Sequence, residues 1–413
     1  MKIKDTTRQK RDGYIWNILS SLVTAISSIL LLMVIKRSIG VDASSDYSVS
    51  VAIANVLINI AHLNSIGFQI SDIRELYSFN TYLKLRRITV AIMLLVAVII
   101  SFIQSKTFIK GVTIFLYCLY RSIYAYVDVY QGRYQQKGRV DIACKLQFYK
   151  VLVPDFVLAI IVIVLKDLIL AIVIASLSEV ILLFFYNKCN LKHFEDFQNV
   201  RLKQCLQLFK QCMPLFFSAF TTCYILNSPK YGIDRILNSV DQVYYAILIL
   251  PATTVHMLAS FMYRPMLTEY SSQWEQKRYH YFMKKVLYLC FFMLIITLGV
   301  ISVGIPIILP LLSRLYGMKE LKNFGFEFAI LLCAGGLNAL NTFLGFIITI
   351  IREQFHMFWI YGTTFFISLF LPDFLIRADG IKGAASSFLF LMLIQTALIV
   401  MVFFTCTLKQ MKD

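Results

Sequence analysis

The chain has 413 residues, of which 59% are hydrophobic and only 15% are charged. This composition excludes a soluble globular domain and is typical of a protein that crosses a membrane many times. The formal net charge of +17 would suggest nucleic-acid binding in a soluble protein, but in a membrane protein the distribution of the charges matters more than their sum, so no nucleic-acid partner is expected.

Twelve stretches are long and apolar enough to cross a bilayer as helices, which takes about 20 residues each. With the N-terminus inside, 27 lysines and arginines fall on the inner side and 12 on the outer side, while Arg121 alone lies within a span. Because positive residues concentrate on the cytoplasmic side, this split predicts that both termini are cytoplasmic. The predicted spans are Tyr14–Ile35, Ser44–Phe68, Ile88–Gln104, Phe108–Asp128, Phe148–Leu165, Leu168–Asn187, Leu206–Leu226, Asp241–Met262, Leu287–Leu312, Phe328–Ile351, Met357–Ile376 and Gly383–Cys406.

Small polar residues follow one face of the first predicted span at helical spacing. This face either packs closely against a neighbouring helix or lines a hydrated cavity. The residues are Asn17, Ser20, Ser21, Thr24, Ser27 and Ser28.

The two halves of the chain resemble each other in their polar residues. The seventh span carries a polar run like that of the first, and Gly40 and Gly232, which follow these two spans, are 192 residues apart. The pattern suggests an internal repeat of six spans. With the polar connector Lys188–Lys210 as the division, the sequence predicts an N-terminal lobe of residues 1–200 and a C-terminal lobe of residues 201–413.

Two segments between the early spans are rich in basic residues. Ser71–Arg87 is interpreted as a cytoplasmic surface loop. Tyr130–Lys150 also contains many aromatic residues, and it is interpreted as an interfacial helix whose cations lie near the lipid phosphates of the inner leaflet.

The fourth span carries a polar stripe formed by Tyr117, Arg121, Tyr124 and Asp128. An arginine at the centre of a span costs roughly 2.5–3.5 kcal/mol, so Arg121 should face a partner or water. Counting inward from the cytoplasmic ends of their helices, Arg121, Asp155 and Glu179 share one layer. Either Arg121 forms a buried pair with one of the two acids, or it faces a cavity and binds an anionic head group while an acid responds to protons or cations.

The most specific stretch is the polar segment Asn227–Ala246, between two long apolar runs. Pro229 disfavours a helix interior, so the preceding helix is expected to end there and a turn containing Asp234 to follow. Asn238 or Ser239 then caps the next helix, which is expected to run from about Asp241 to Met262.

Arg264 follows that helix as a candidate contact for a head group, although a basic residue at a helix end more commonly extends to the interface.

The segment resembles the Wzx-type O-antigen and polysaccharide flippases of the multidrug/oligosaccharidyl-lipid/polysaccharide exporter superfamily. Tyr244-Tyr245-Ala246 lacks the glycine that the family usually has after an aromatic residue, and Arg37-Ser-Ile-Gly-Val41 is a weaker match near the end of the first span. The matching residues are Asn227, Pro229, Lys230, Tyr231, Ile233, Asp234, Gln242 and Pro251. The resemblance implies an all-α polytopic membrane protein with about 12 transmembrane helices in two six-helix lobes around a central cavity, a MATE-like fold.

The function implied by the resemblance is that of a flippase. Such a protein moves an undecaprenyl-diphosphate-linked oligosaccharide, the repeat unit of an O-antigen or similar polysaccharide, from the inner to the outer leaflet of the bacterial cytoplasmic (inner) membrane by alternating access. Its expected partners are the lipid-linked glycan, membrane lipids, and the polymerase and chain-length machinery of polysaccharide or lipopolysaccharide biosynthesis. No cofactor is expected.

The candidate site residues fall into two groups. For substrate binding they are Arg121, Lys230, Arg37, Arg264, Tyr117, Tyr124 and Asn17. For gating or ion coupling they are Asp234, Asp42, Asp155 and Glu179.

Enzymatic function is not indicated. The five histidines have neither metal-ligand spacing nor an evident nucleophile partner, the nine cysteines form no metal-binding motif, and no phosphate-binding loop is present, so no metal site is predicted. The alternatives are a multidrug or cation antiporter of the same superfamily and a membrane glycan polymerase or glycosyltransferase. The latter typically has a large catalytic outer loop, whereas the longest outer segment here is about Ser313–Glu327.

Overall fold

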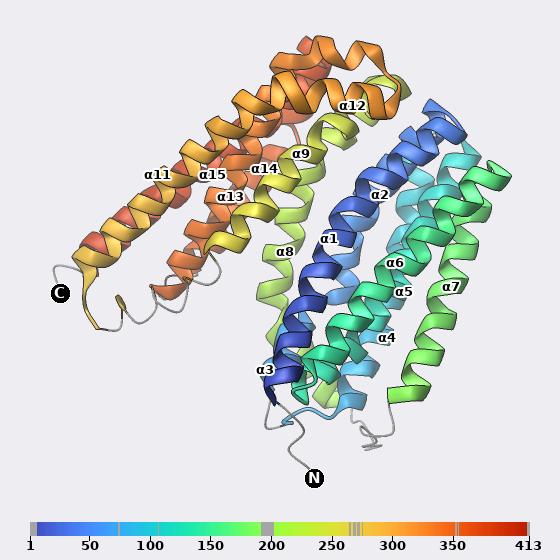
Figure 1. Ribbon diagram of the computed structural model, residues 1–413. Coiled ribbons are helices and arrows are strands. Elements are labelled where there is room, and N and C mark those ends of the chain that lie inside the picture. Colours follow the sequence, from blue (N-terminus) through green and yellow to red (C-terminus); the bar gives the residue numbers. More distant parts are fainter. Residues whose placement is uncertain are drawn as a thin grey trace. The chain divides into compact units, whose positions relative to one another are not determined.

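The computed structural model describes residues 6–72, 75–105, 107–190, 202–263, 266, 270, 273–274, 276–351, 353 and 355–410 (Figure 1). Every regular element in these ranges is a helix, and eight helical stretches are long and apolar enough to cross a membrane. The predicted all-helical, multi-span architecture is therefore confirmed.

The chain divides into two compact units, Met1–Phe220 and Thr221–Asp413. The helix α8 (Leu202–Ile236) contributes residues to both units. The division into lobes of residues 1–200 and 201–413 stays a prediction.

The first unit is organised around α5, the fifth helix of the chain. This helix packs against α2, α3, α4, α6 and α7, whereas α1 packs mainly against α6. The most apolar segment of α5 is 56% buried inside the protein. In the six possible spans other than α5 and α13, the corresponding segment is at most one third buried. A helix that is shielded from lipid can carry polar residues, and α5 is the least apolar of the eight. The elements are α1 (Thr6–Ser38), α2 (Val41–His62), α3 (Ser65–Ser71), α4 (Phe79–Gln104), α5 (Phe108–Gln136), α6 (Val140–Leu165) and α7 (Leu168–Asn190).

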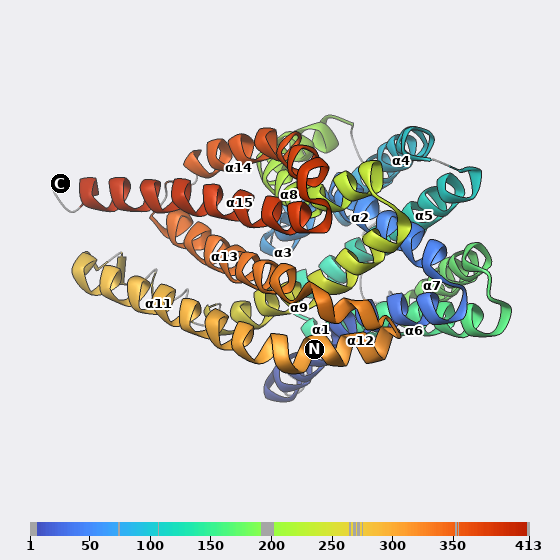
Figure 2. The same cartoon turned by 90° about the horizontal axis from the view of Figure 1, so that it is seen from above.

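The second unit is organised around α13. This helix packs against α9, α11 and α15, and Figure 2 shows it between α11 and α15. A Cβ atom at Gly335 would lie 2.6 Å from the carbonyl oxygen of Ala252, and one at Gly336 would overlap the Thr297 side chain, so this glycine pair lets α13 pack closely on its neighbours. The elements that follow α8 are α9 (Ser239–Tyr263), α11 (Tyr279–Val303), a π-helical turn (Gly304–Ile308), α12 (Leu309–Tyr316), a 3-10 turn (Lys319–Phe324), α13 (Gly325–Ile350), α14 (Phe355–Ser368) and α15 (Leu371–Gln410).

The expected helix end at Pro229 is wrong, because α8 continues through the proline to Ile236. A proline has no N–H, so it leaves the carbonyl four residues earlier, that of Ile225, without its usual donor. The hydroxyl of Ser228 donates to this carbonyl at 2.9 Å and so replaces the missing bond. Lys230 and Asp234 consequently lie on a helix and not in a turn.

The predicted cap of the next helix is confirmed. The side-chain oxygen of Asn238 accepts a hydrogen bond from the backbone N–H of Asp241 at 2.9 Å, and α9 begins at Ser239.

The interfacial helix expected over Tyr130–Lys150 is also wrong. Its residues form the end of α5 and the beginning of α6, which are joined by a short turn in which Gly138 has a φ of +74°. The aromatic and basic side chains that suggested a membrane-surface segment instead lie on two packed helices, and Lys150 is fully buried.

Two predicted spans are interrupted. The stretch Ser44–Phe68 breaks at Leu63 and Asn64, which both have positive φ values, so α2 and α3 are separate helices. The stretch Met357–Ile376 breaks after Ser368, so α14 has only 14 residues, or about 21 Å at 1.5 Å per residue.

The segment Arg377–Lys382, between the last two predicted spans, is not a loop but part of α15, which has a kink at Gly380, whose φ is +57°.

The break after α2 explains the buried position of Arg86, which was assigned to the loop Ser71–Arg87. In fact α4 begins at Phe79, and Arg86 is 1% exposed. Its guanidinium donates to the Ala61 carbonyl and, at 3.1 Å, to the Ser65 hydroxyl. The last carbonyls of a helix have no partner within it, and Arg86 supplies one across the break.

We predict that Arg86→Ala destabilises the protein by about 1–3 kcal/mol, because the Ala61 and Ser65 oxygens lose a charged donor inside the protein. The midpoint of thermal unfolding of the purified protein measures this change. Arg87→Ala is the matched control, since Arg87 is the next residue of the same helix and is exposed. Equal midpoints for the two variants would contradict the role given to Arg86.

Candidate functional site

A cluster of charged side chains lies inside the first unit, where the polar stripe of α5 faces its neighbours. Asp128 on α5 forms an ion pair with Lys150 on α6, and the Nε2 atom of His62 on α2 lies 2.8 Å from the same carboxylate. The side chains of Lys150 and Asp128 are 0% and 8% exposed. Three helices therefore meet at one buried carboxylate.

Two cations contact the ring of Tyr124, which lies one helical turn from Asp128. The Lys150 ammonium is 3.5 Å from the ring centroid and the Arg121 guanidinium is 4.4 Å from it. Such cation–π contacts stabilise a cation by about 0.5–2 kcal/mol. The Tyr124 hydroxyl accepts a hydrogen bond from Gln147 at 2.7 Å, so the ring that positions Arg121 is itself held in place.

Arg121 is half-buried, and its Nε atom is buried without a hydrogen-bond partner. Within the part of the chain that the structure describes, no ion pair or hydrogen bond joins Arg121 to a carboxylate. The direct pair with Asp155 or Glu179, one of the two sequence-based alternatives, is therefore not formed. The guanidinium stays available to an anion.

Asp155 is held by neutral donors. The hydroxyl of Tyr120 donates to its Oδ1 atom at 3.2 Å, and the hydroxyl of Ser27 on α1 donates to the same side chain. One residue of the polar face of α1 thus contacts α6, which supports the helix-packing interpretation for that residue.

Glu179 on α7 is 0% exposed, and neither of its carboxylate oxygens has a hydrogen-bond partner among the described residues. Lys150 and Arg121 attract its charge, and Asp128 and Asp155 oppose it. The structure therefore brings Arg121, Asp155 and Glu179 into one cluster, in the layer where the sequence placed them.

Aromatic rings extend this cluster along α5. Tyr117 is 7% exposed and packs edge-to-face on Tyr47 of α2, with 5.4 Å between the ring centroids. Its ring also lies 5.7 Å from that of Tyr120, whose hydroxyl contacts Asp155. Tyr117 is thus a packing residue as well as a candidate for binding.

Sequence reasoning missed Lys150 and His62. The position of Lys150 could have been predicted from the α5–α6 hairpin. Residues that are equally many positions from the turn of such a hairpin lie at similar depths in the two helices. Asp128 is 10 residues before Gly138 and Lys150 is 12 residues after it, while Arg121 and Asp155 are each 17 residues away. His62 gives no such signal, since it ends a helix from elsewhere in the unit.

The other candidate residues do not join this cluster by any described contact. Asn17 and Arg37 are exposed and lie about 30 Å apart along α1, so they cannot bind the same phosphate group. Asp42 is exposed in the first turn of α2. Lys230 and Asp234 belong to the part of α8 in the second unit, and Arg264 lies outside the described residues.

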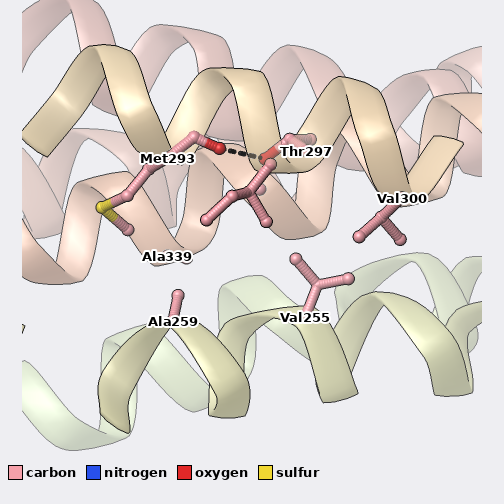
Figure 3. Close-up of a pocket in the computed structure, with 8 residues that line it drawn as sticks. Val255, Ala259, Met293, Thr297, Val300 and Ala339 are labelled. Atoms are coloured by element: carbon pink, nitrogen blue, oxygen red, sulfur yellow. Dashed lines mark hydrogen bonds between the residues drawn. The ribbon is translucent and has the colours of Figure 1, made fainter. Parts of the chain in front are cut away.

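The second unit contains an apolar pocket of about 50 Å³ between α9, α11 and α13 (Figure 3). Its single polar group is the Thr297 hydroxyl, which already donates to the Met293 carbonyl at 2.8 Å. Without a free donor or a charge, this pocket is unsuited to an anionic head group. The side chains labelled in Figure 3 are those of Val255, Ala259, Met293, Thr297, Val300 and Ala339.

The chain matches no protein-family model and no curated protein by sequence. Its structure is similar to that of the lipid II flippase MurJ in an inward closed conformation, with a TM-score of 0.67 and 12% identity over 95% of this chain and 90% of that chain. A eukaryotic MATE transporter gives a TM-score of 0.66 and 11% identity over 98% and 99% of the two chains. An inward-facing multidrug resistance MATE family transporter of the MOP superfamily gives 0.65 and 12% over 95% and 98%.

The chain therefore has a MATE-like fold, and the predicted all-helical, multi-span fold class is confirmed. The similar structures are named as transporters in two cases and as a lipid flippase in the third. The fold alone thus accommodates different substrates, and the charges of the site have to distinguish between them.

We predict that Lys150→Met and Asp128→Asn each destabilise the protein by about 3–5 kcal/mol, because either change leaves a buried charge without its partner. The double variant should recover most of this loss, since no unpaired charge remains. Thermal unfolding of the purified variants measures the effect, with the half-buried Lys145→Met as the control on the same helix. Additive losses in the double variant would show that the two charges do not stabilise each other.

Proposed function

We propose that the chain is a flippase for a lipid-linked oligosaccharide whose lipid carries a diphosphate. The observation that carries this proposal is Arg121, a half-buried guanidinium on the central helix of its unit, with no carboxylate partner among the described residues. A planar guanidinium binds two phosphate oxygens at once, and the geometry is fixed when the side chain rests on a ring such as that of Tyr124.

The charges around Arg121 favour an anionic substrate. Asp128 is already paired with Lys150, and Asp155 accepts hydrogen bonds from hydroxyl groups. Among the described residues, neither acid therefore forms an ion pair with Arg121. The likeness to a protein named as a lipid II flippase supports a lipid-linked substrate. The resemblance of Asn227–Ala246 to the Wzx-type flippases supports an undecaprenyl-diphosphate-linked glycan, such as an O-antigen repeat unit.

The proposed mechanism is alternating access in the bacterial cytoplasmic membrane, with both termini cytoplasmic. The glycan and diphosphate occupy a hydrated cavity, while the polyprenyl chain stays in lipid. An inside-negative potential helps an anionic head group to move outward, by about 2.3 kcal/mol per charge per 100 mV. The polysaccharide polymerase and the chain-length machinery would receive the product on the outer side.

Within this proposal the remaining candidate residues have supporting roles. Lys230 with Asp234, and Arg37 with Asp42, are proposed to gate access, because each pair combines a base and an acid near the end of a long helix. Glu179 is proposed as the group that responds to protons, since a buried carboxylate without hydrogen bonds changes its environment strongly when it gains or loses charge.

A multidrug or cation antiporter is the second candidate, because two MATE transporters match this chain with TM-scores close to that of MurJ. A cationic drug would be repelled by Arg121 and would need the acids instead. Removal of Arg121 therefore separates the two functions: it should abolish transport of an anionic lipid and leave or improve that of a cationic drug.

We predict that Arg121→Ala abolishes export of the lipid-linked glycan while the protein accumulates normally, because Arg121 forms no direct ion pair with a carboxylate among the described residues. Arg121→Lys should keep part of the activity, since it keeps the charge but loses the two-pronged contact. Mass spectrometry of the lipid-linked glycan that accumulates in a deletion strain carrying each variant measures export. Arg87→Ala, on the exposed face of α4, is the matched control.

A fall in the protein level of Arg121→Ala, with level and export both restored by a second change of Asp155→Asn or Glu179→Gln, would instead give Arg121 a structural role.

We predict that Glu179→Gln makes the rate of export independent of an imposed pH gradient, while the wild type responds to it. The amide keeps the size of the side chain and cannot titrate. The measurement uses purified protein in proteoliposomes across a gradient of about one pH unit, where one titrating group changes its occupancy up to tenfold. Asp155→Asn is tested in parallel, and loss of the response in that variant alone would contradict the role of Glu179.

A further inference from the structure

A second cluster of potential ligands lies in the other unit, where α14 begins and α15 ends. The cluster consists of Glu353, His356 and Cys406, and one ligand atom from each lies within 4.8 Å of the other two. Helices α14 and α15 pack against each other, as Figure 2 also shows. The packing brings together residues that are 50 positions apart in the sequence.

Local structure orients the first two ligands. The backbone N–H of His356 donates to the carbonyl of Glu353 at 3.1 Å, which closes a turn at the start of α14. This turn puts the His356 Nδ1 atom 3.3 Å from the Glu353 Oε2 atom. The two side chains therefore point at the same place without any rearrangement of the backbone.

The nitrogen and the carboxylate oxygen make an incomplete contact. The Nδ1 atom of His356 is buried, yet it forms no hydrogen bond within the described chain. In a neutral imidazole this atom is an acceptor when the proton is on Nε2, and an ionised carboxylate is only an acceptor. At 3.3 Å, either a proton on Nδ1 or a metal ion bound by both atoms holds the nitrogen and the carboxylate oxygen together.

The Cys406 side chain decides between these two species. A thiol adds nothing to a proton shared by imidazole and carboxylate, whereas a thiolate is a strong ligand for zinc. Calcium and magnesium prefer oxygen ligands only, and copper(I) prefers sulfur over carboxylate. A set of one sulfur, one nitrogen and one oxygen suits Zn²⁺.

The distances are compatible with this ion. Zinc–ligand bonds of about 2.0–2.3 Å put the ligand atoms of a tetrahedral site roughly 3.3–3.8 Å apart. Side-chain rotations that move the ligand atoms by about 1 Å close the site, since they lie within 4.8 Å of one another. Glu353 and His356 are about one third and just under one half exposed, so an ion can enter from solvent.

We propose that Glu353, His356 and Cys406 bind a Zn²⁺ ion that links the first turn of α14 to the C-terminal part of α15. Three protein ligands leave one coordination position for water, as in exchangeable zinc sites and unlike the closed four-ligand sites that hold small domains together. The ion therefore binds reversibly and stiffens this end of the second unit when zinc is present. The proposal does not depend on the transported substrate.

The test measures metal content in the full-length purified chain. The affinity tag is removed, because polyhistidine binds zinc, and the protein is stripped with a chelator, equilibrated with Zn²⁺ and desalted. Inductively coupled plasma mass spectrometry should find about one zinc per chain in the wild type. Cys406→Ser and His356→Ala should each lower the affinity at least about tenfold, and Glu353→Gln should also weaken it.

Matched controls are present in the same unit. Cys290→Ser replaces another partly buried cysteine and His280→Ala another histidine, and both should retain zinc as the wild type does. In the presence of a chelator, Cys406→Ser and the wild type should have the same midpoint of thermal unfolding, which would show that the variant is folded. Added zinc should raise this midpoint in the wild type and not in Cys406→Ser.

Cobalt substitution gives a second readout, because a thiolate ligand produces a charge-transfer absorption that Cys406→Ser must lack. The proposal is overturned if the wild type retains no zinc, or if Cys406→Ser and His356→Ala retain as much as the wild type.

Discussion

The buried pair of Asp128 and Lys150 is the interaction on which the arrangement of the first unit depends. A single charge at this depth in a membrane protein is costly, and the opposite charge on the next helix removes most of that cost. The pair joins α5 to α6, and His62 brings in α2. Both Lys150 and Arg121 contact the ring of Tyr124, so the ring links the position of Arg121 to the buried pair. A structural charge pair thus helps to determine the position of Arg121, the residue proposed to bind the head group.

The same arrangement shows how one fold serves different substrates. The similar structures include MATE transporters and a lipid II flippase, although the sequences share only 11–12% of their residues with this chain. Helix lengths and packing define the fold, and these survive extensive change as long as the exterior stays apolar. In the proposed function, the charge at the few partly exposed positions inside a unit selects the substrate, because function depends on the site and not on the fold.

The sequence predicted the helical class and the layer of Arg121, Asp155 and Glu179, because long apolar runs and charges within them are strong signals in a membrane protein. The sequence-based predictions were wrong at positions where the local sequence pattern indicates one structure and the tertiary contacts produce another. Pro229 indicates a helix end, but the Ser228 hydroxyl replaces the lost bond. Lys150 lies among aromatic and basic residues that resemble a surface segment, and only its packing against Asp128 identifies it as buried.

The proposed zinc ligands could not be predicted from the sequence either. Metal-binding motifs are recognised in a sequence by short spacings, such as two cysteines separated by two residues. His356 and Cys406 come from different helices, so their proximity results from the packing of α14 on α15 and has no signature along the chain.

The glycine pair of α13 has a mechanical consequence for the second unit. At Gly335 the backbone of α13 lies directly against the backbone of α9 at Ala252, and at Gly336 it lies against the Thr297 side chain of α11. Sliding α13 by one residue, about 1.5 Å, would replace a glycine at the contact with a residue that has a Cβ atom, and the helices would collide. These three helices must therefore move as one body. Deformation within the unit is easier where the helical hydrogen bonds are already interrupted, as at the π-helical turn Gly304–Ile308 and the kink at Gly380.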